Sequence, residues 1–274
     1  MTDLFFFLSF FVYLISFIGF GFYFKSLKKE ALKYAQLVLL VGFIFHTLFW
    51  VFKIFQIFTT SLLSFKYLFN FLSWELVLIY FLFTILPIKI YATGFFLLPI
   101  VLILLLLSYF FPQEIFSPFS PHFKSLWFPL HAFTGLFSHG FLLFGTVTSL
   151  MYILQEREIK KKHLGLFFRK LPPLEYLDKV TEKCLYLGFI FLSLAMISGA
   201  IWSEIAFGNY WRWSPKEVIT LILWLIYAVL IHQRVLIGWR GKKASYMFLL
   251  GFSIWLISFF VINLFSKGFH TYGS

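Results

Sequence analysis

The segment from Gly208 to Glu217 reads GNYWRWSPKE and places three aromatic side chains within four residues, beside two cations. It separates two long apolar runs. An irregular backbone of this kind is not tolerated facing lipid inside a bilayer, because its polar groups would lack hydrogen-bond partners. Flat rings with cations nearby suit a large planar anion as ligand. An aromatic belt at the membrane surface is the alternative interpretation of the same residues.

Histidines supply a second chemistry. Of the seven in the chain, His46 and His232 fall within apolar runs, as GFIFHTLFW and AVLIHQR. An ionisable side chain inside a span is costly and indicates a functional site, although a hydrogen bond between helices is the alternative. His131 and His270 lie at the edges of other apolar runs. Two neutral imidazoles facing one another are the axial ligands that low-spin haem iron takes.

Composition places these residues in a membrane protein. The chain is 61% hydrophobic and only 12% charged, and its mean hydropathy is +0.90. A soluble domain carries about twice that charged fraction. The net charge of +12 comes from short basic runs between apolar spans. Because that arrangement orients membrane proteins, it favours a lipid bilayer as the surroundings and no nucleic acid as partner.

The single cysteine, Cys184, excludes an internal disulfide and any CxxC or CxxCH motif. The chain is therefore neither a dithiol reductant nor a covalent c-type haem carrier. Cys184 itself is expected to be a small apolar residue in a helix.

The elements that position these side chains are predicted to be helices about 20 residues long, the length that crosses a bilayer. The fold class is all-α, a polytopic membrane protein with about eight transmembrane helices, both termini outside, and a single domain over residues 1–274. The longest polar stretch, 155–181, is expected to hold a short amphipathic piece on the membrane surface. The spans are predicted at 4–24, 35–58, 67–88, 94–111, 129–154, 182–203, 217–237 and 244–265.

Orientation follows from the basic residues. Most of the 23 lysines and arginines fall in the first, third, fifth and seventh connections. The positive-inside rule puts those connections in the cytoplasm. The aromatic segment, His131 and His270 then share the outer side. His139 follows His131 by eight residues on about the same helix face, and a polar contact is favoured over a role as spare ligand.

These residues resemble a known family. GAIWSEIAFGNYWRWSPKE is similar to the tryptophan-rich WWD signature of haem-handling proteins in cytochrome c biogenesis, and the closest branch is the CcsA (ResC) family of System II. LHAFTGLFSHGFL and FSKGFHTYG resemble the family's outer-histidine segments, and GFIFHTLFW and AVLIHQR resemble its membrane-histidine segments. One residue departs from the pattern: the family's aspartate after the last tryptophan is Ser214 here. Glu217 and Glu204 are nearby acids that could replace it.

The resemblance implies a subunit of a holocytochrome c synthase that binds haem b without a covalent bond. His46 and His232 would take haem within the membrane, and His131 and His270 would hold its iron at the outer surface. Trp202, Tyr210, Trp211 and Trp213 would line the ring, and Arg212 and Lys216 would contact the propionates. The implied partners are a CcsB/ResB-type membrane subunit with a periplasmic domain, apocytochrome c and thiol-reducing proteins. The implied location is the bacterial inner membrane, with the WWD-like loop and both termini periplasmic.

Other functions remain open from the sequence. A HemX-like haem-binding regulator of tetrapyrrole synthesis shares the eight-span plan, and the six-span relative CcmC is disfavoured by the number of spans. A non-haem transporter or scaffold is the last alternative. A proton-driven transporter usually needs an acid in the membrane, and Glu75 is the one clear candidate. We expect Glu75 to be a buried hydrogen-bonding partner instead.

Overall fold

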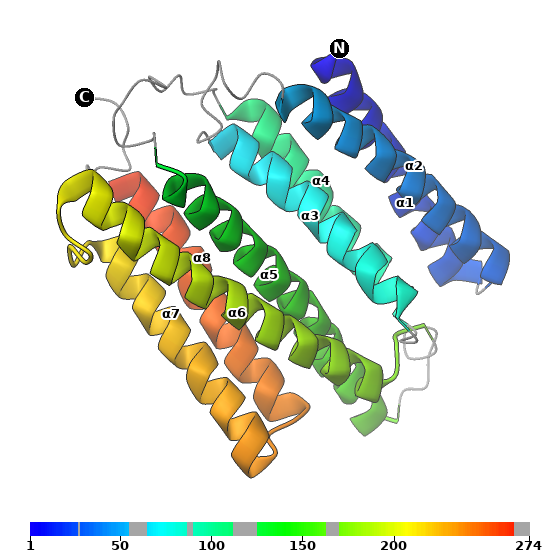
Figure 1. Ribbon diagram of the computed structural model, residues 1–274. Coiled ribbons are helices and arrows are strands. Elements are labelled where there is room, and N and C mark those ends of the chain that lie inside the picture. The colour runs from blue at the N-terminus through cyan, green and yellow to red at the C-terminus, as the bar shows by residue number, and fades with distance from the viewer. Residues whose placement is uncertain (27, 55–64, 87–89, 112–124, 163–169, 266–274) are drawn as a thin grey trace. The chain divides into compact units, whose positions relative to one another are not determined.

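The computed structural model describes all residues except 27, 55–64, 87–89, 112–124, 163–169 and 266–274. The described residues form α-helices connected by turns (Figure 1). One short π-helix, η2 (Gln233–Ile237), follows α7 directly. The α-helices are α1 (Thr2–Ser26), α2 (Lys29–Ile54), α3 (Phe65–Ile85), α4 (Thr93–Phe110), α5 (Trp127–Lys160), α6 (Leu174–Phe207), α7 (Pro215–His232) and α8 (Lys242–Phe265).

The helices follow the apolar runs, and the prediction of an all-helical membrane protein is confirmed. Within the described residues, α1 to α6 and the stretch from Pro215 to Ile237 are long and apolar enough to cross a bilayer. Helices dominate for a physical reason: every backbone N–H and C=O inside a bilayer must be paired within the segment itself. The chain is an integral membrane protein.

The polar stretch at 155–181 is described except for residues 163–169. In its described part, α5 continues to Lys160 and α6 begins at Leu174. An ion pair of 2.8 Å between Lys160 and Glu156, one turn apart, supports the end of α5. Pro172 and Pro173 precede the first turn of α6, where a residue without an N–H removes no helical hydrogen bond. The described polar residues therefore extend two membrane helices, and the expected amphipathic piece on the membrane surface stays a prediction.

The chain divides into two compact units. Unit 1 comprises Met1–Ile115 and Ile153–Leu177, and unit 2 comprises Phe116–Tyr152 and Asp178–Ser274. In unit 1, α1 packs against α2 and α4, while α3 packs against α2 and α4, which makes a bundle of four neighbouring helices. Its interior holds Tyr13, Phe20, Leu39 and Tyr80. That the whole chain acts as a single haem-handling domain stays a prediction.

Unit 2 is also a bundle in which each helix contacts the next. The rings of Phe189 on α6 and Trp224 on α7 lie 5.2 Å apart, and those of Tyr227 on α7 and Phe248 on α8 lie 5.6 Å apart. α6 has 34 residues, as many as α5. At 1.5 Å per residue its 34 residues extend for about 51 Å, beyond the roughly 30 Å of a hydrocarbon core. The helix is therefore long enough to extend beyond the hydrocarbon core.

Candidate functional site

His131 lies in the first turns of α5 with its ring against α6. Its Nδ1 is 2.8 Å from the carbonyl oxygen of Ala195. A carbonyl can only accept, so Nδ1 carries the proton, and in a neutral ring Nε2 then keeps its lone pair. Metal-binding histidines in proteins are oriented in this way, by a hydrogen bond from the other ring nitrogen to a carbonyl or carboxylate.

A notch in α6 accommodates this ring. A Cβ atom at Gly199 would lie 2.7 Å from His131 Nδ1 and 2.8 Å from its Cε1, closer than real Cβ contacts occur. Trp202 follows three residues later on the same helix face, and its ring is nearly parallel to the imidazole, at 12° with centroids 6.2 Å apart. Ala195, Gly199 and Trp202 are spaced by four and three residues, which is the repeat of one helix face. The sequence did not single out Gly199, although a small residue in a span is a known signal of close helix packing.

The aromatic loop begins where α6 ends. Gly208 has a φ of +72° and directs the chain away from the helix axis. Beyond it, Tyr210 is 62% exposed and Trp213 is 72% exposed. Trp211 is partly covered, and its indole N–H is buried without a hydrogen-bond partner among the described residues. The loop thus presents two rings outward while Trp202 packs on the histidine.

Glu217 holds the loop against the start of α7. Its Oε2 accepts the backbone N–H groups of Ser214, at 2.9 Å, and Arg212, at 3.0 Å. The Ser214 hydroxyl accepts the Glu217 N–H in return, at 3.3 Å, which completes a capping box with Pro215 as the first helical residue. Ser214, where the family has aspartate, is therefore the N-cap residue of α7.

Ser214→Asp is expected to leave function within about twofold of the parent, because serine and aspartate are equally good N-caps. The added charge is favourable at a helix N-terminus by about 0.3–1 kcal/mol, but it faces the Glu217 carboxylate. The measurement is the yield of c-type cytochrome in a host that depends on this chain. A tenfold gain would mean that the carboxylate has a chemical task which serine does not perform.

Arg212 contacts its own loop. Its guanidinium carbon lies 3.9 Å from the centre of the Phe207 ring, and its Nε lies 3.9 Å from Glu217 Oε1. Lys216 stands in the first turn of α7 and is partly exposed. The predicted contacts of Arg212 and Lys216 with propionates stay predictions. For Arg212, such a contact would compete with a weak, partly solvated pair to Glu217.

The membrane histidines lie in different units. His46 in unit 1 is fully buried, with Nδ1 3.3 Å from the Tyr13 hydroxyl and Nε2 3.1 Å from Asn70 Oδ1. These bonds join α1, α2 and α3, so His46 would have to release one of them to bind a metal. His232 in unit 2 is the last residue of α7 and is exposed. Their pairing at one iron stays a prediction.

His139 and Glu75, two other polar residues in the spans, differ in their hydrogen bonding. His139 donates from Nδ1 to the Gly135 carbonyl and lies 4.9 Å from the Trp255 ring, as expected for a polar contact. Glu75 is buried in unit 1, and neither carboxylate oxygen has a hydrogen-bond partner among the described residues. The expected hydrogen-bonding role of Glu75 is therefore not seen. His270, the predicted second outer ligand, lies outside the described residues.

Fold and site together define a class: a polytopic membrane protein with an oriented imidazole beside an aromatic loop. The profile of the family described as cytochrome C assembly protein matches residues 60–270. Three similar proteins are cytochrome c biogenesis proteins CcsA. They come from Guillardia theta (32% identity over 172 residues, 57% of each chain), Cyanophora paradoxa (31% over 211 residues, 61% of this chain and 64% of that one) and Trieres chinensis (31% over 235 residues, 74% of each).

The chain belongs to the CcsA family of cytochrome c assembly proteins. The match spans less than two thirds of the length of the Guillardia and Cyanophora relatives. The resemblance found in the sequence motifs is thereby confirmed at the level of the family.

Proposed function

We propose that this chain binds haem b in the membrane and presents it at the outer face for attachment to the CxxCH segment of apocytochrome c. The observation that carries the proposal is the environment of His131. Its Nδ1 is tied to the Ala195 carbonyl, its Nε2 lone pair is available, and its ring lies beside Trp202. An oriented neutral imidazole next to flat apolar rings suits the iron and the macrocycle of haem.

The aromatic loop has side chains that suit the porphyrin ring and the propionates of haem. Trp213 and Tyr210 are exposed rings that can cover the porphyrin, and aromatic contacts add about 0.5–1.5 kcal/mol each beyond the buried area. The Trp211 indole N–H, which has no hydrogen-bond partner among the described residues, is a donor for a carboxylate. Lys216 and Arg212 add positive charge for the propionates. His270 supplies the second imidazole in this proposal, and His46 and His232 receive haem on its way outward.

The chemistry at the outer face is the addition of each cysteine S–H across a haem vinyl double bond, which conserves atoms and electrons but requires reduced thiols. Cys184, the only cysteine in the chain, is buried in α6. We therefore propose thiol-reducing proteins as partners, together with apocytochrome c and a CcsB/ResB-type subunit that binds apocytochrome c. The chain contributes by positioning haem rather than by acid–base catalysis. In this proposal the loop and both termini face the outside of a bacterial inner membrane.

The test begins with the purified protein and a pyridine haemochrome assay, in which we expect non-covalent b-type haem. The chain is then produced with its partner subunit in a host that lacks its own maturation system, and c-type cytochromes are scored by covalent haem. His131→Ala and His270→Ala are each expected to reduce that yield at least tenfold. His139→Asn, on the same helix as His131, keeps a donor for the Gly135 carbonyl and is the matched control.

Three results would contradict the proposal in different ways. A folded protein without b-type haem would remove every haem-based function. Bound haem with unchanged maturation in both outer-histidine variants would favour the HemX-like regulator. An equal loss in His139→Asn would mean that α5 as a whole, and not the His131 imidazole, is needed.

A further inference from the structure

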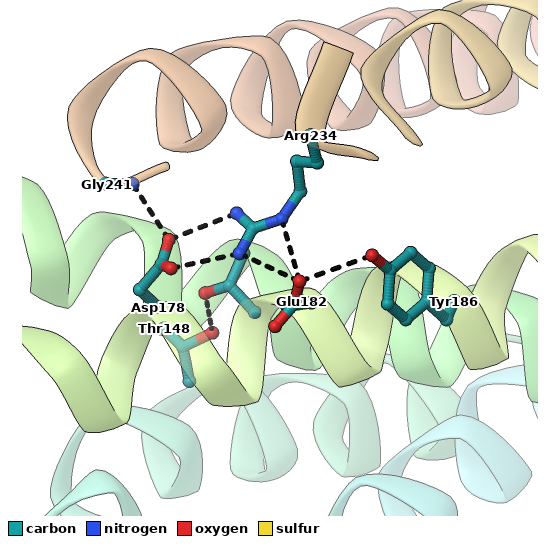
Figure 2. Close-up of polar contacts among 7 residues, drawn as sticks. Thr148, Asp178, Glu182, Tyr186, Arg234 and Gly241 are labelled. Carbon is teal, nitrogen blue, oxygen red and sulfur yellow. Dashed lines mark hydrogen bonds and ion pairs between the residues drawn. The ribbon is translucent and has the colours of Figure 1, made fainter. Parts of the chain in front are cut away.

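A buried arginine of η2, Arg234, binds two carboxylates near the beginning of α6 (Figure 2). The Arg234 side chain is 2% exposed, and its two terminal nitrogens bind both carboxylate oxygens of Asp178, at 3.1 and 2.9 Å. Its Nε donates to Glu182 at 3.4 Å, and the Tyr186 hydroxyl donates to the same carboxylate oxygen at 3.2 Å. Asp178, Glu182 and Tyr186 are spaced by four residues along one face of α6.

The same carboxylate also holds the turn between α7 and α8. Asp178 Oδ1 accepts the backbone N–H of Gly241 at 2.8 Å. Gly241 has a φ of +61°, and a Cβ there would lie 2.3 Å from the Tyr152 hydroxyl oxygen, so the position requires glycine. Asp178 therefore bonds both to Arg234 in η2 and to Gly241, directly before α8.

His232 lies two residues before Arg234, at the end of α7. Regular α-helix ends at His232, and η2 follows from Gln233 to Ile237 and closes at Gly238, with a φ of +75°. A π-helical turn changes the angular spacing of side chains and often occurs at functional sites. Two residues apart on this backbone, Arg234 is buried against α6 while His232 is exposed. Because one residue separates them, a change in the backbone at Arg234 also affects the backbone next to His232.

We infer that the Arg234–Asp178–Glu182 cluster is a positioning device for His232, which it holds facing out of unit 2 to receive haem. The inference rests on the proposed function. Stability alone is a weak reason for the cluster, because apolar residues of similar size stabilise a buried position as well as an ion pair does. Directional, two-pronged binding of a carboxylate is what arginine adds. The cluster lies about 36 Å along α6 from Trp202, so it serves the opposite bilayer face.

The first experiment measures position without haem. His232→Cys is labelled with a nitroxide, since the only native cysteine, Cys184, is buried. We expect Asp178→Asn and Arg234→Lys each to increase the mobility of the label in its electron paramagnetic resonance spectrum. Thr181→Val is the matched control: it removes a buried 2.8 Å hydrogen bond to Thr148 at the same end of α6 and leaves the end of α7 intact. An unchanged label in both cluster variants overturns the inference.

The second experiment measures haem in proteins that retain His232. Asp178→Asn and Arg234→Lys are expected to lower haem per folded protein about tenfold and to convert low-spin to high-spin iron in what remains. In the His232→Ala background they are expected to add nothing further, because both changes act through one ligand. Additive losses would overturn the inference while leaving the proposed function in place. Wild-type protein without haem would overturn the proposed function, and the label result would still report on the helix end.

Discussion

Gly199→Ala is expected to lower c-type cytochrome maturation about tenfold to hundredfold, the range typical of lost support for a metal-binding histidine. The added methyl would meet His131 Nδ1 at 2.7 Å, which is shorter than the hydrogen bond from that atom to Ala195. The ring must therefore turn or shift, and Nε2 leaves its direction. Overpacking of this kind also costs about 1–3 kcal/mol of stability.

The measurement is covalent haem on a reporter apocytochrome, normalised to the amount of folded chain. Gly135→Ala is the control on the facing helix: its Cβ would lie 4.0 Å from the nearest atom, the Ala195 Cβ, which is an ordinary contact. We expect it to match the parent. Equal activity of the two alanine variants would show that the orientation of His131 is unimportant, even if His131 itself were needed.

Glu217→Ala is expected to reduce maturation about tenfold and to destabilise the start of α7. It removes the only acceptor that the described structure gives to the Ser214 and Arg212 N–H groups. Loss of a cap costs about 0.5–2 kcal/mol, and the two partly buried N–H groups would also lose their acceptor. The exposed rings of Tyr210 and Trp213 would then lose their fixed support, so haem content should fall together with maturation.

Glu217→Gln and Glu204→Ala are the control variants for Glu217→Ala. Glutamine still completes a capping box, so we expect an intermediate loss that reports the charge alone. Glu204 is the other acid near the loop, and only its backbone carbonyl is bonded to the loop in the described structure, to Gly208 N. Replacement of Glu204 is expected to be silent. A larger loss in Glu204→Ala than in Glu217→Ala would contradict this prediction. It would mean that Glu204, and not Glu217, is the acid on which the loop depends.

The helices could be predicted because bilayer thickness and backbone pairing leave one solution for an apolar run of 20 residues. The ends of α5 and α6 were harder to predict. Hydropathy does not record whether a polar run such as 155–160 continues a helix, and here the Lys160–Glu156 pair helps it continue. The capping box at Ser214 and Glu217 was readable in principle, since a serine followed three residues later by glutamate is its known pattern.

The site could be predicted only as a set of residue types. His131 was expected beside the aromatic segment, and the structure places its ring against Trp202. That Ala195 provides the acceptor and Gly199 the space depends on the register of α5 against α6, which one sequence does not contain. For His46, the partners Tyr13 and Asn70 come from two other helices. Spacing along one span could not reveal them.

A single rigid helix, α6, carries both Asp178 and the face formed by Ala195, Gly199 and Trp202. An α-helix is stiff along its axis, so a movement at one end of α6 is transmitted to its other end. A tilt of about 5° over the roughly 36 Å between Asp178 and Trp202 displaces one end by about 3 Å relative to the other. That displacement is as large as the 2.8 Å distance between His131 Nδ1 and the Ala195 carbonyl oxygen, so a change in the tilt of α6 would alter both the contacts of Asp178 and the orientation of His131.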